Sequence, residues 1–277
     1  MQEILWLGNA RLLLALNHFT ADHSALYALM LFATDKFADI LTLATFALLW
    51  FWPQIKQRRH LQQHAAARLN PFARAWENLR TQLAMDLTRE QSRAQFLVLG
   101  LAGAIGYSTA RLIAFELDIS RPFMTYLPVR AAMDGAFDGL RTFGSFPSDH
   151  AVLLASLPVA LLYWDRRMAL LWAGVSIILA CARVAVGFHY PLDMVGGAVI
   201  GVLVTSVSFA IYERRGSFHT AFTVLGKAFD LKNAPYCYVL YFLMVLGAVE
   251  FAMHFQHVLT MLFTLRGELL SRFSIFS

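Results

Sequence analysis

The chain alternates between long stretches without charged residues and shorter polar segments. Apolar, charge-free runs occupy residues 40–55, 94–110, 151–164, 168–182, 194–212 and 233–249. A helix rises about 1.5 Å per residue, so crossing a bilayer core of about 30 Å takes about 20 residues. Several runs are shorter than this, but one more helical turn through the ionisable residue at the end of each run restores a spanning length. The pattern therefore predicts an all-α fold, a polytopic transmembrane helical bundle with about six spans.

Composition agrees with a membrane protein and excludes other classes. Of the 277 residues, 58% are hydrophobic and only 15% are charged, whereas a soluble domain has about 45–50% apolar and about 25% charged residues. Disordered, collagen-like and disulfide-stabilised chains are excluded, because low hydrophobicity, glycine periodicity and dense cysteine are all absent. The two cysteines, Cys181 and Cys237, lie in apolar stretches, where a free thiol behaves as a small hydrophobic side chain.

The charge is concentrated in one segment. Residues 54–93 hold eight basic and three acidic side chains, a net charge of +5 that equals the net charge of the whole chain. Such a segment between helices indicates a cytoplasmic loop in contact with anionic lipid headgroups, and it argues against a nucleic-acid partner. If the short basic segments 165–167 and 213–215 are also cytoplasmic, the loops at 117–147 and 187–192 share the opposite face.

These features divide the chain into five parts. We expect an interfacial segment at residues 1–36, because its apolar runs are too short to span, and a first span at 37–53. The basic cytoplasmic segment at 54–93 follows. Residues 94–215 are expected to form the membrane core that carries the chemistry, and residues 216–277 a C-terminal amphipathic stretch with the last span.

Three polar blocks fall at the ends of the central runs. They read DISRP at 118–122, SFPSDH at 145–150 and ARVAVGFHYPLD at 182–193. Pro147 and Ser148 predict a helix start, whose free backbone N–H groups and positive dipole end bind phosphate. Arg121 and Arg183 would add planar guanidinium groups that hold phosphoryl oxygens in pairs. Together the blocks predict a phosphate-binding site.

Two histidines and one aspartate offer the groups that phosphoester cleavage needs. His189 precedes a predicted helix start at Pro191, and Asp193 lies four residues after the histidine. The carboxylate can accept one ring N–H, which presents the other ring nitrogen as a nucleophile. His150 is then left as the acid that protonates the leaving oxygen.

The order RP, PSxH and Rx5Hx3D resembles the membrane-embedded type 2 phosphatidic acid phosphatase superfamily, over about residues 94–212. Its members hydrolyse lipid phosphates and diphosphates through a phosphohistidine intermediate, with no metal and no other cofactor. The resemblance implies three catalytic residues, namely the nucleophile His189, its orienting partner Asp193 and the general acid His150. It implies three phosphate ligands, namely Arg121, Arg183 and Ser148.

The sequence departs from the usual pattern of that superfamily at three positions. Asp149 replaces the commoner Gly, which is similar to the bacterial undecaprenyl-diphosphate phosphatases associated with bacitracin resistance; its side chain would contact a diphosphate, tune His150 or cap the helix. The usual Lys seven residues before the first-block Arg is Ala114. Arg111, one turn earlier, either binds phosphate in its place or is an interfacial residue at a helix end. The Ser that usually precedes the third-block Arg is Ala182.

The resemblance implies a hydrolase that removes the terminal phosphate of a polyprenyl diphosphate, undecaprenyl diphosphate above all, in the bacterial cell envelope. The site would face the periplasm or exterior side of the inner (cytoplasmic) membrane. One alternative keeps the chemistry but acts on phosphatidic acid, phosphatidylglycerol phosphate or a lipid A phosphate. Another is a non-catalytic phosphate-lipid binder or a transporter, although the sequence lacks the repeats typical of transporters. The expected partners are the lipid substrate and membrane lipids, and the oligomeric state is left open.

Overall fold

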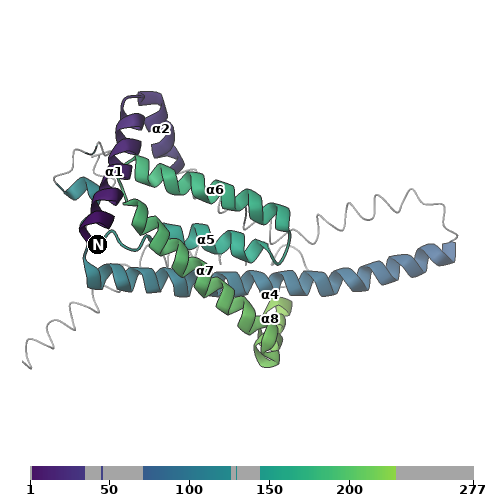
Figure 1. Cartoon of the computed structure of the whole chain (residues 1–277). Helices are drawn as coiled ribbons and strands as arrows, with labels where there is room; N and C mark the ends of the chain where they lie inside the picture. The colour runs from purple at the N-terminus through teal and green to yellow at the C-terminus, as the bar shows by residue number, and fades with distance from the viewer. Residues whose placement is uncertain (1, 35–44, 46–70, 126–128, 130–143, 229–277) are drawn as a thin grey trace, which may run out of the picture. The chain divides into compact units, whose positions relative to one another are not determined.

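The computed structural model of the chain describes residues 2–34, 45, 71–125, 129 and 144–228, with the backbone alone for residues 2–7, 71–89 and 227–228. All regular structure in these residues is helical, which confirms the predicted all-α class (Figure 1). The elements are α1 Gln2–Ala21, α2 Ser24–Phe32, α4 Pro71–Leu117, the 3₁₀ helix η2 Pro122–Met124, α5 Asp149–Leu161, α6 Arg166–Ala185, α7 Pro191–Arg214 and α8 Gly216–Ala228. The chain divides into two compact units, Met1–Gly226 and Lys227–Ser277.

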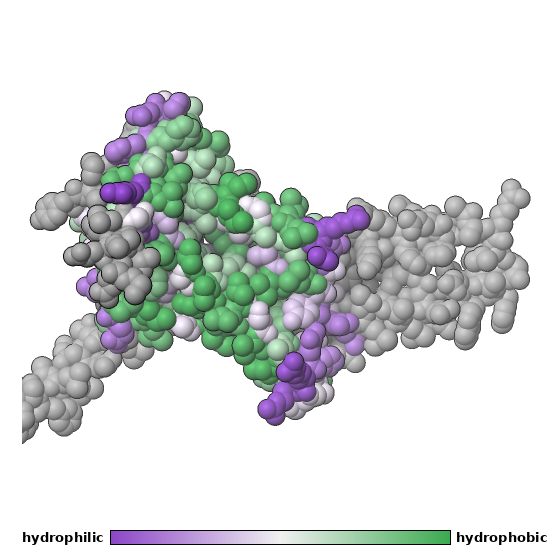
Figure 2. All heavy atoms as spheres, in the orientation of Figure 1, coloured by the Kyte–Doolittle hydropathy of each residue, from purple (hydrophilic) through white to green (hydrophobic). Residues whose placement is uncertain are grey.

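Three stretches of the described helices are long and apolar enough to cross a membrane: Glu90–Met124, Arg166–Ala185 and Pro191–Arg214. The apolar helix α5 is shorter. Large hydrophobic side chains lie exposed along the outer faces of α6 and α7, and Figure 2 shows hydrophobic residues across the middle of the visible face with hydrophilic residues gathered at its ends. Apart from residue 45, the expected spans at 37–53 and after residue 228 lie outside the described residues, so the total of about six stays a prediction.

Helix α4 continues without a break from the basic segment into the apolar one. The expected change from a cytoplasmic segment to a span, at residue 94, falls inside this 47-residue helix. The helix ends at Leu117, and Asp118 takes a left-handed φ of 40°, a conformation that Asp tolerates better than most residues. The first polar block therefore begins where α4 ends.

Two glycines let α7 approach α5 closely. A Cβ atom at Gly197 would overlap the carbonyl oxygen of Ser148, and one at Gly201 would overlap that of Val152. Small residues at such crossings allow helix backbones to come together in membranes. The approach brings the start of α5 against the start of α7, where the Ser148 backbone N–H donates to the Asp193 carbonyl oxygen at 3.0 Å.

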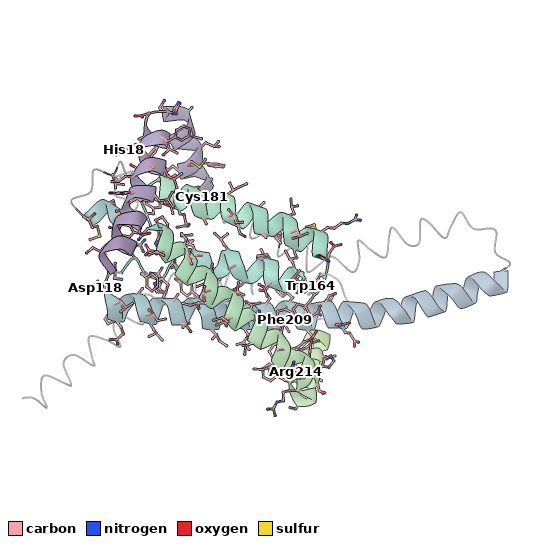
Figure 3. The ribbon with its side chains drawn as sticks, viewed as in Figure 1. His18, Asp118, Trp164, Cys181, Phe209 and Arg214 are labelled. Atoms are coloured by element: carbon pink, nitrogen blue, oxygen red, sulfur yellow. The ribbon has the colours of Figure 1, made fainter. Side chains whose placement is uncertain are left out.

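An aromatic core holds the other end of the bundle together. Phe209 of α7 is fully buried, stacks on Tyr163 with ring centroids 4.3 Å apart, and meets Trp164 edge-on. Figure 3 shows Trp164, Phe209 and Arg214 away from the end marked by Asp118. The apolar packing therefore leaves the Asp118 end of the bundle for polar side chains.

At the Asp118 end, α1 packs against α6 and α7, and α2 packs against α1 and α6 (Figure 3). The fully buried Asn17 donates from Nδ2 to the Ala185 carbonyl oxygen at 2.7 Å, and Asn9 accepts from the Leu192 backbone N–H at 3.0 Å. Leu13, also fully buried, packs in a cluster with Tyr190. The location of residues 1–36 at a membrane interface stays a prediction, but their helices are part of the packing around the third polar block.

Candidate active site

The three polar blocks meet around His189. This residue lies in the connection between α6 and α7, and only 1% of it is exposed. Its Nε2 atom is 3.1 Å from Nη1 of Arg121 and 3.4 Å from Oγ of Ser148, residues that are 68 and 41 positions away in the chain. The tertiary structure thus brings the predicted nucleophile next to two of its predicted phosphate ligands.

The partners of the two ring nitrogens decide the tautomer of His189. A guanidinium N–H can only donate, so Nε2 beside Arg121 must present its lone pair. The hydrogen is then on Nδ1, which lies 3.1 Å from the Ser145 carbonyl oxygen and 3.4 Å from Oδ2 of Asp193. With its proton on the far side of the ring, His189 directs an unprotonated nitrogen at the guanidinium group, as a nucleophile toward an arginine-bound phosphate requires.

Asp193 is held rigidly behind the histidine. Its Oδ2 atom accepts the Tyr190 backbone N–H at 2.8 Å, which closes a capping box at the start of α7. The same oxygen accepts a hydrogen bond from the Ser145 hydroxyl. Asp193 is also buried. Because these two donors fix the carboxylate, the fold sets its position beside the His189 ring, as the predicted orienting role requires.

Burial and charge keep His189 neutral. Burial away from water is the main cause that lowers its pKa from 6.5 to about 4, and the positive charge of Arg121 adds to the effect. The hydrogen bond and charge of Asp193 oppose this shift, while Arg183 lowers the pKa slightly further. At neutral pH the ring therefore carries its lone pair.

Helix α5 begins where Pro147 and Ser148 predict. Ser148 is the N-cap residue, and its Oγ atom accepts the Ala151 backbone N–H at 3.4 Å. The same hydroxyl lies beside Nε2 of His189. The positive end of the helix dipole and Nε2 of His189, the predicted nucleophile, therefore face the same point, where the helix dipole favours an anion such as phosphate.

Asp149 does not cap α5, because Ser148 does. Its Oδ1 atom instead accepts the backbone N–H of His150 and faces Nδ1 of the His150 ring, each at 2.7 Å. Its Oδ2 side forms an ion pair with Arg111 of α4. The expectation that Arg111 reaches the site therefore has a structural basis, but the residue it contacts there is a carboxylate.

Arg183 and Arg121 are both buried. Arg183 donates from Nη2 to the Thr34 carbonyl oxygen at 3.0 Å, which connects it to the segment after α2. Arg121 donates to the Phe188 carbonyl oxygen at 3.2 Å, while its Nε is buried and has no hydrogen-bond partner among the described residues. A buried donor of this kind suits an anionic oxygen.

Residues 92–217 match the PAP2 superfamily model. They form a PAP2 superfamily domain. The matched range contains all three polar blocks and every site residue named above except Thr34. The resemblance drawn from those blocks is thereby confirmed.

Curated relatives of the chain include an undecaprenyl-diphosphatase, a putative undecaprenyl-diphosphatase and a lipid A 1-phosphatase. The chain is 29% identical over 119 residues to undecaprenyl-diphosphatase BcrC of Bacillus subtilis strain 168, covering 43% of the chain and 58% of the relative. It is 35% identical over 77 residues to the putative undecaprenyl-diphosphatase YbjG of Escherichia coli K12, covering 26% and 37%. It is 30% identical over 139 residues to a lipid A 1-phosphatase of Rhizobium johnstonii, covering 47% and 56%.

The chain thus spans 37–58% of the length of these three curated relatives. No solved structure matches it significantly. Among the residues that the structure describes, no three His, Cys, Asp or Glu side chains are grouped so as to hold a metal ion.

Ser145 is the PAP2-domain site residue that sequence reasoning missed. It is fully buried, and it contacts both His189 and Asp193. Its backbone N–H donates to the Ile119 carbonyl oxygen at 2.6 Å, which connects the first and second blocks. Its position as the first residue of SFPSDH was the available signal, but nothing in the sequence indicates which groups it contacts.

Proposed function

We propose that this PAP2 domain is a phosphatase that removes the terminal phosphate of a polyprenyl diphosphate, with undecaprenyl diphosphate as the first candidate. The observation that carries the proposal is the state of His189. Its Nε2 lone pair faces Arg121 and Ser148, while its Nδ1–H is directed at Ser145 and Asp193. The names of the relatives BcrC and YbjG support the choice of substrate.

Hydrolysis proceeds in two steps in this proposal. First, Nε2 of His189 forms a P–N bond while the bond from the terminal phosphorus to the bridging oxygen breaks, and His150 gives a proton to that oxygen. Undecaprenyl monophosphate leaves. Then water attacks the phosphorus, His150 takes one of its protons, the P–N bond breaks and inorganic phosphate leaves. Both histidines return to their starting states.

The charge that develops on the phosphoryl oxygens needs donors at fixed positions. Arg121 and Ser148 lie beside the nucleophile, and the start of α5 adds backbone N–H groups. Arg183 lies close enough for its charge to act on His189. We propose that these three side chains hold the terminal phosphate.

The proposed site faces the periplasm or exterior of a bacterial inner membrane. His189 follows the end of α6 and precedes the start of α7, so the basic residues 166–167 and 214–215 lie at the opposite ends of these two helices. Basic residues concentrate on the cytoplasmic side of membrane proteins. The site then lies on the other side.

The test is phosphate release from undecaprenyl diphosphate by the purified full-length chain in detergent, with excess chelator, for wild type and His189→Ala. We expect release by wild type alone, and transfer of label from the terminal phosphate of the substrate to wild-type protein in a rapid quench. Equal release by His189→Ala would overturn the phosphohistidine step. No release from this or any lipid phosphate would indicate a phosphate-lipid binder or transporter.

A second candidate keeps the mechanism and changes the lipid. The similarity to lipid A 1-phosphatases extends over 47% of the chain, slightly more than the similarity to BcrC. A panel of undecaprenyl diphosphate, lipid A, phosphatidic acid and phosphatidylglycerol phosphate distinguishes the two. Turnover confined to lipid A or to the glycerophospholipids would overturn the diphosphatase assignment.

A further inference from the structure

We infer that Asp149 is a positioning residue for the general acid His150 and that Arg111 acts through Asp149, so that each of the two histidines works with its own carboxylate. The inference rests on the proposed function. It assigns Arg111 a role other than direct phosphate binding.

The carboxylate of Asp149 uses its two sides for different partners. Oδ1 lies 2.7 Å from Nδ1 of His150 and accepts that residue's backbone N–H at 2.7 Å. The other side of the carboxylate is ion-paired with Arg111. Asp149 and Arg111 are buried, whereas the His150 side chain is 37% exposed. The charged pair is therefore inside the bundle and the ring is at its surface.

This arrangement fixes which nitrogen of His150 can act. A carboxylate only accepts, so Nδ1 must carry a hydrogen and Nε2 is the nitrogen that remains for proton transfer. A neighbouring carboxylate also interacts favourably with the doubly protonated ring, which is the form that donates a proton. Asp149 thus does for His150 what Asp193 does for His189, since each carboxylate faces the Nδ1 side of its ring.

Arg111 is held from two sides. Its Nε donates to the Tyr107 hydroxyl at 3.2 Å, and its guanidinium carbon lies 5.3 Å from the centre of that ring. It also forms the ion pair with Asp149. A buried carboxylate without a counter-charge is costly, so Arg111 keeps Asp149 ionised and in place. Asp149, which stands where the superfamily commonly has Gly, and Arg111, one turn before the position of the usual Lys, therefore form one ion-paired unit.

Loss of a residue that positions the general acid should lower the rate most for substrates whose leaving group most needs a proton. The leaving group of an aryl phosphate is an acidic phenol, which needs little proton donation. The leaving group of phosphatidic acid is an alcohol, which needs proton donation most. A polyprenyl diphosphate loses a phosphate ester and lies between them. Loss of general acid catalysis costs about 10²–10⁴-fold where the proton is required.

The experiment measures kcat/KM, which reports the steps up to loss of the leaving group, for p-nitrophenyl phosphate, undecaprenyl diphosphate and phosphatidic acid. The variants are Asp149→Asn, Arg111→Met and the double variant, with His150→Ala as reference. Glu213→Gln is the control, an exposed carboxylate at the far end of α7. We expect Asp149→Asn to lose about 10²-fold or more on phosphatidic acid and about threefold or less on the aryl phosphate, as His150→Ala does.

The double variant separates positioning from misfolding, because it removes both buried charges and leaves neither unpaired. It should be no less active than Asp149→Asn on any substrate. Equal losses on all three substrates for the double variant would overturn the role of Asp149. Arg111→Met could instead lower kcat/KM by the same factor on all three substrates, and this loss could add to that of Asp149→Asn in the double variant. That result would show that Arg111 binds phosphate directly. A wild type inactive on all three substrates would instead overturn the proposed function, and this inference with it.

Discussion

Replacing Asp193 with Asn tests how the charge behind His189 contributes to the reaction. The substitution keeps the size of the side chain and keeps an oxygen for Oδ2, because the Tyr190 backbone N–H and the Ser145 hydroxyl both donate to that position. The amide nitrogen then takes the other position. The fold around the start of α7 should survive, and only the negative charge is lost.

The size of the effect follows from one distance. Formation of the P–N bond makes the ring of His189 positive, and Nδ1 lies 3.4 Å from Oδ2 of Asp193. Two unit charges at that separation interact by about 5 kcal/mol at an effective dielectric constant of about 20, and about 1.4 kcal/mol corresponds to a tenfold change in rate. The Ser145 carbonyl still accepts the Nδ1 hydrogen, so part of the support remains. We expect kcat to fall about 10³-fold.

The assay is single-turnover phosphate release from undecaprenyl diphosphate, alongside steady-state kcat and KM. KM should change little, because Asp193 is on the Nδ1 side of the ring, away from Arg121 and Ser148. Asp165→Asn is the matched control, since Asp165 caps α6 at the other end of the bundle and Asn caps equally well. A loss in kcat below about tenfold, or one confined to KM, would refute the electrostatic role of Asp193.

Four further predictions concern pH and packing. The value of kcat/KM should fall as the pH falls through about 4, where His189 gains a proton and loses its lone pair; an acid limb near its ordinary pKa of 6.5 would contradict this. Because the folded pKa is the lower one, the unfolded chain binds the proton first, so thermal unfolding should show stability declining between pH 6.5 and about 4. Gly197→Ala should cost about 1–3 kcal/mol of stability and also lower kcat, because its Cβ would overlap the Ser148 carbonyl oxygen. Gly174→Ala is the control, since there is open space around Gly174. It should leave the melting temperature in detergent and the activity unchanged. Asn17→Ala should destabilise the chain by about 1–3 kcal/mol by removing a buried donor to Ala185, and an unchanged melting temperature would show that α1 does not stabilise the third block.

Much of the architecture follows from local physics and was open to sequence reasoning. Apolar runs of the right length give the helices, because a backbone in lipid must satisfy its own hydrogen bonds. Pro147 and Ser148 start α5, and Pro191 starts α7, for conformational and capping reasons that hold in any fold. The sequence also indicated which residues are candidates for the site, because His, Asp and Arg at the ends of apolar helices are costly unless they face protein or water.

Tertiary structure decided which of these groups touch. The close approach of α5 and α7 at Gly197 brings Ser148 beside His189. The hydrogen bond from the Ser145 backbone N–H to the Ile119 carbonyl oxygen connects the first and second blocks, a contact that the sequence does not indicate. The same holds for Arg111 of α4, whose ion-pair partner Asp149 lies on the neighbouring helix α5. Helix periodicity specifies the face on which a side chain lies, but the partner across that face depends on how the helices cross and on which atoms the packing leaves exposed.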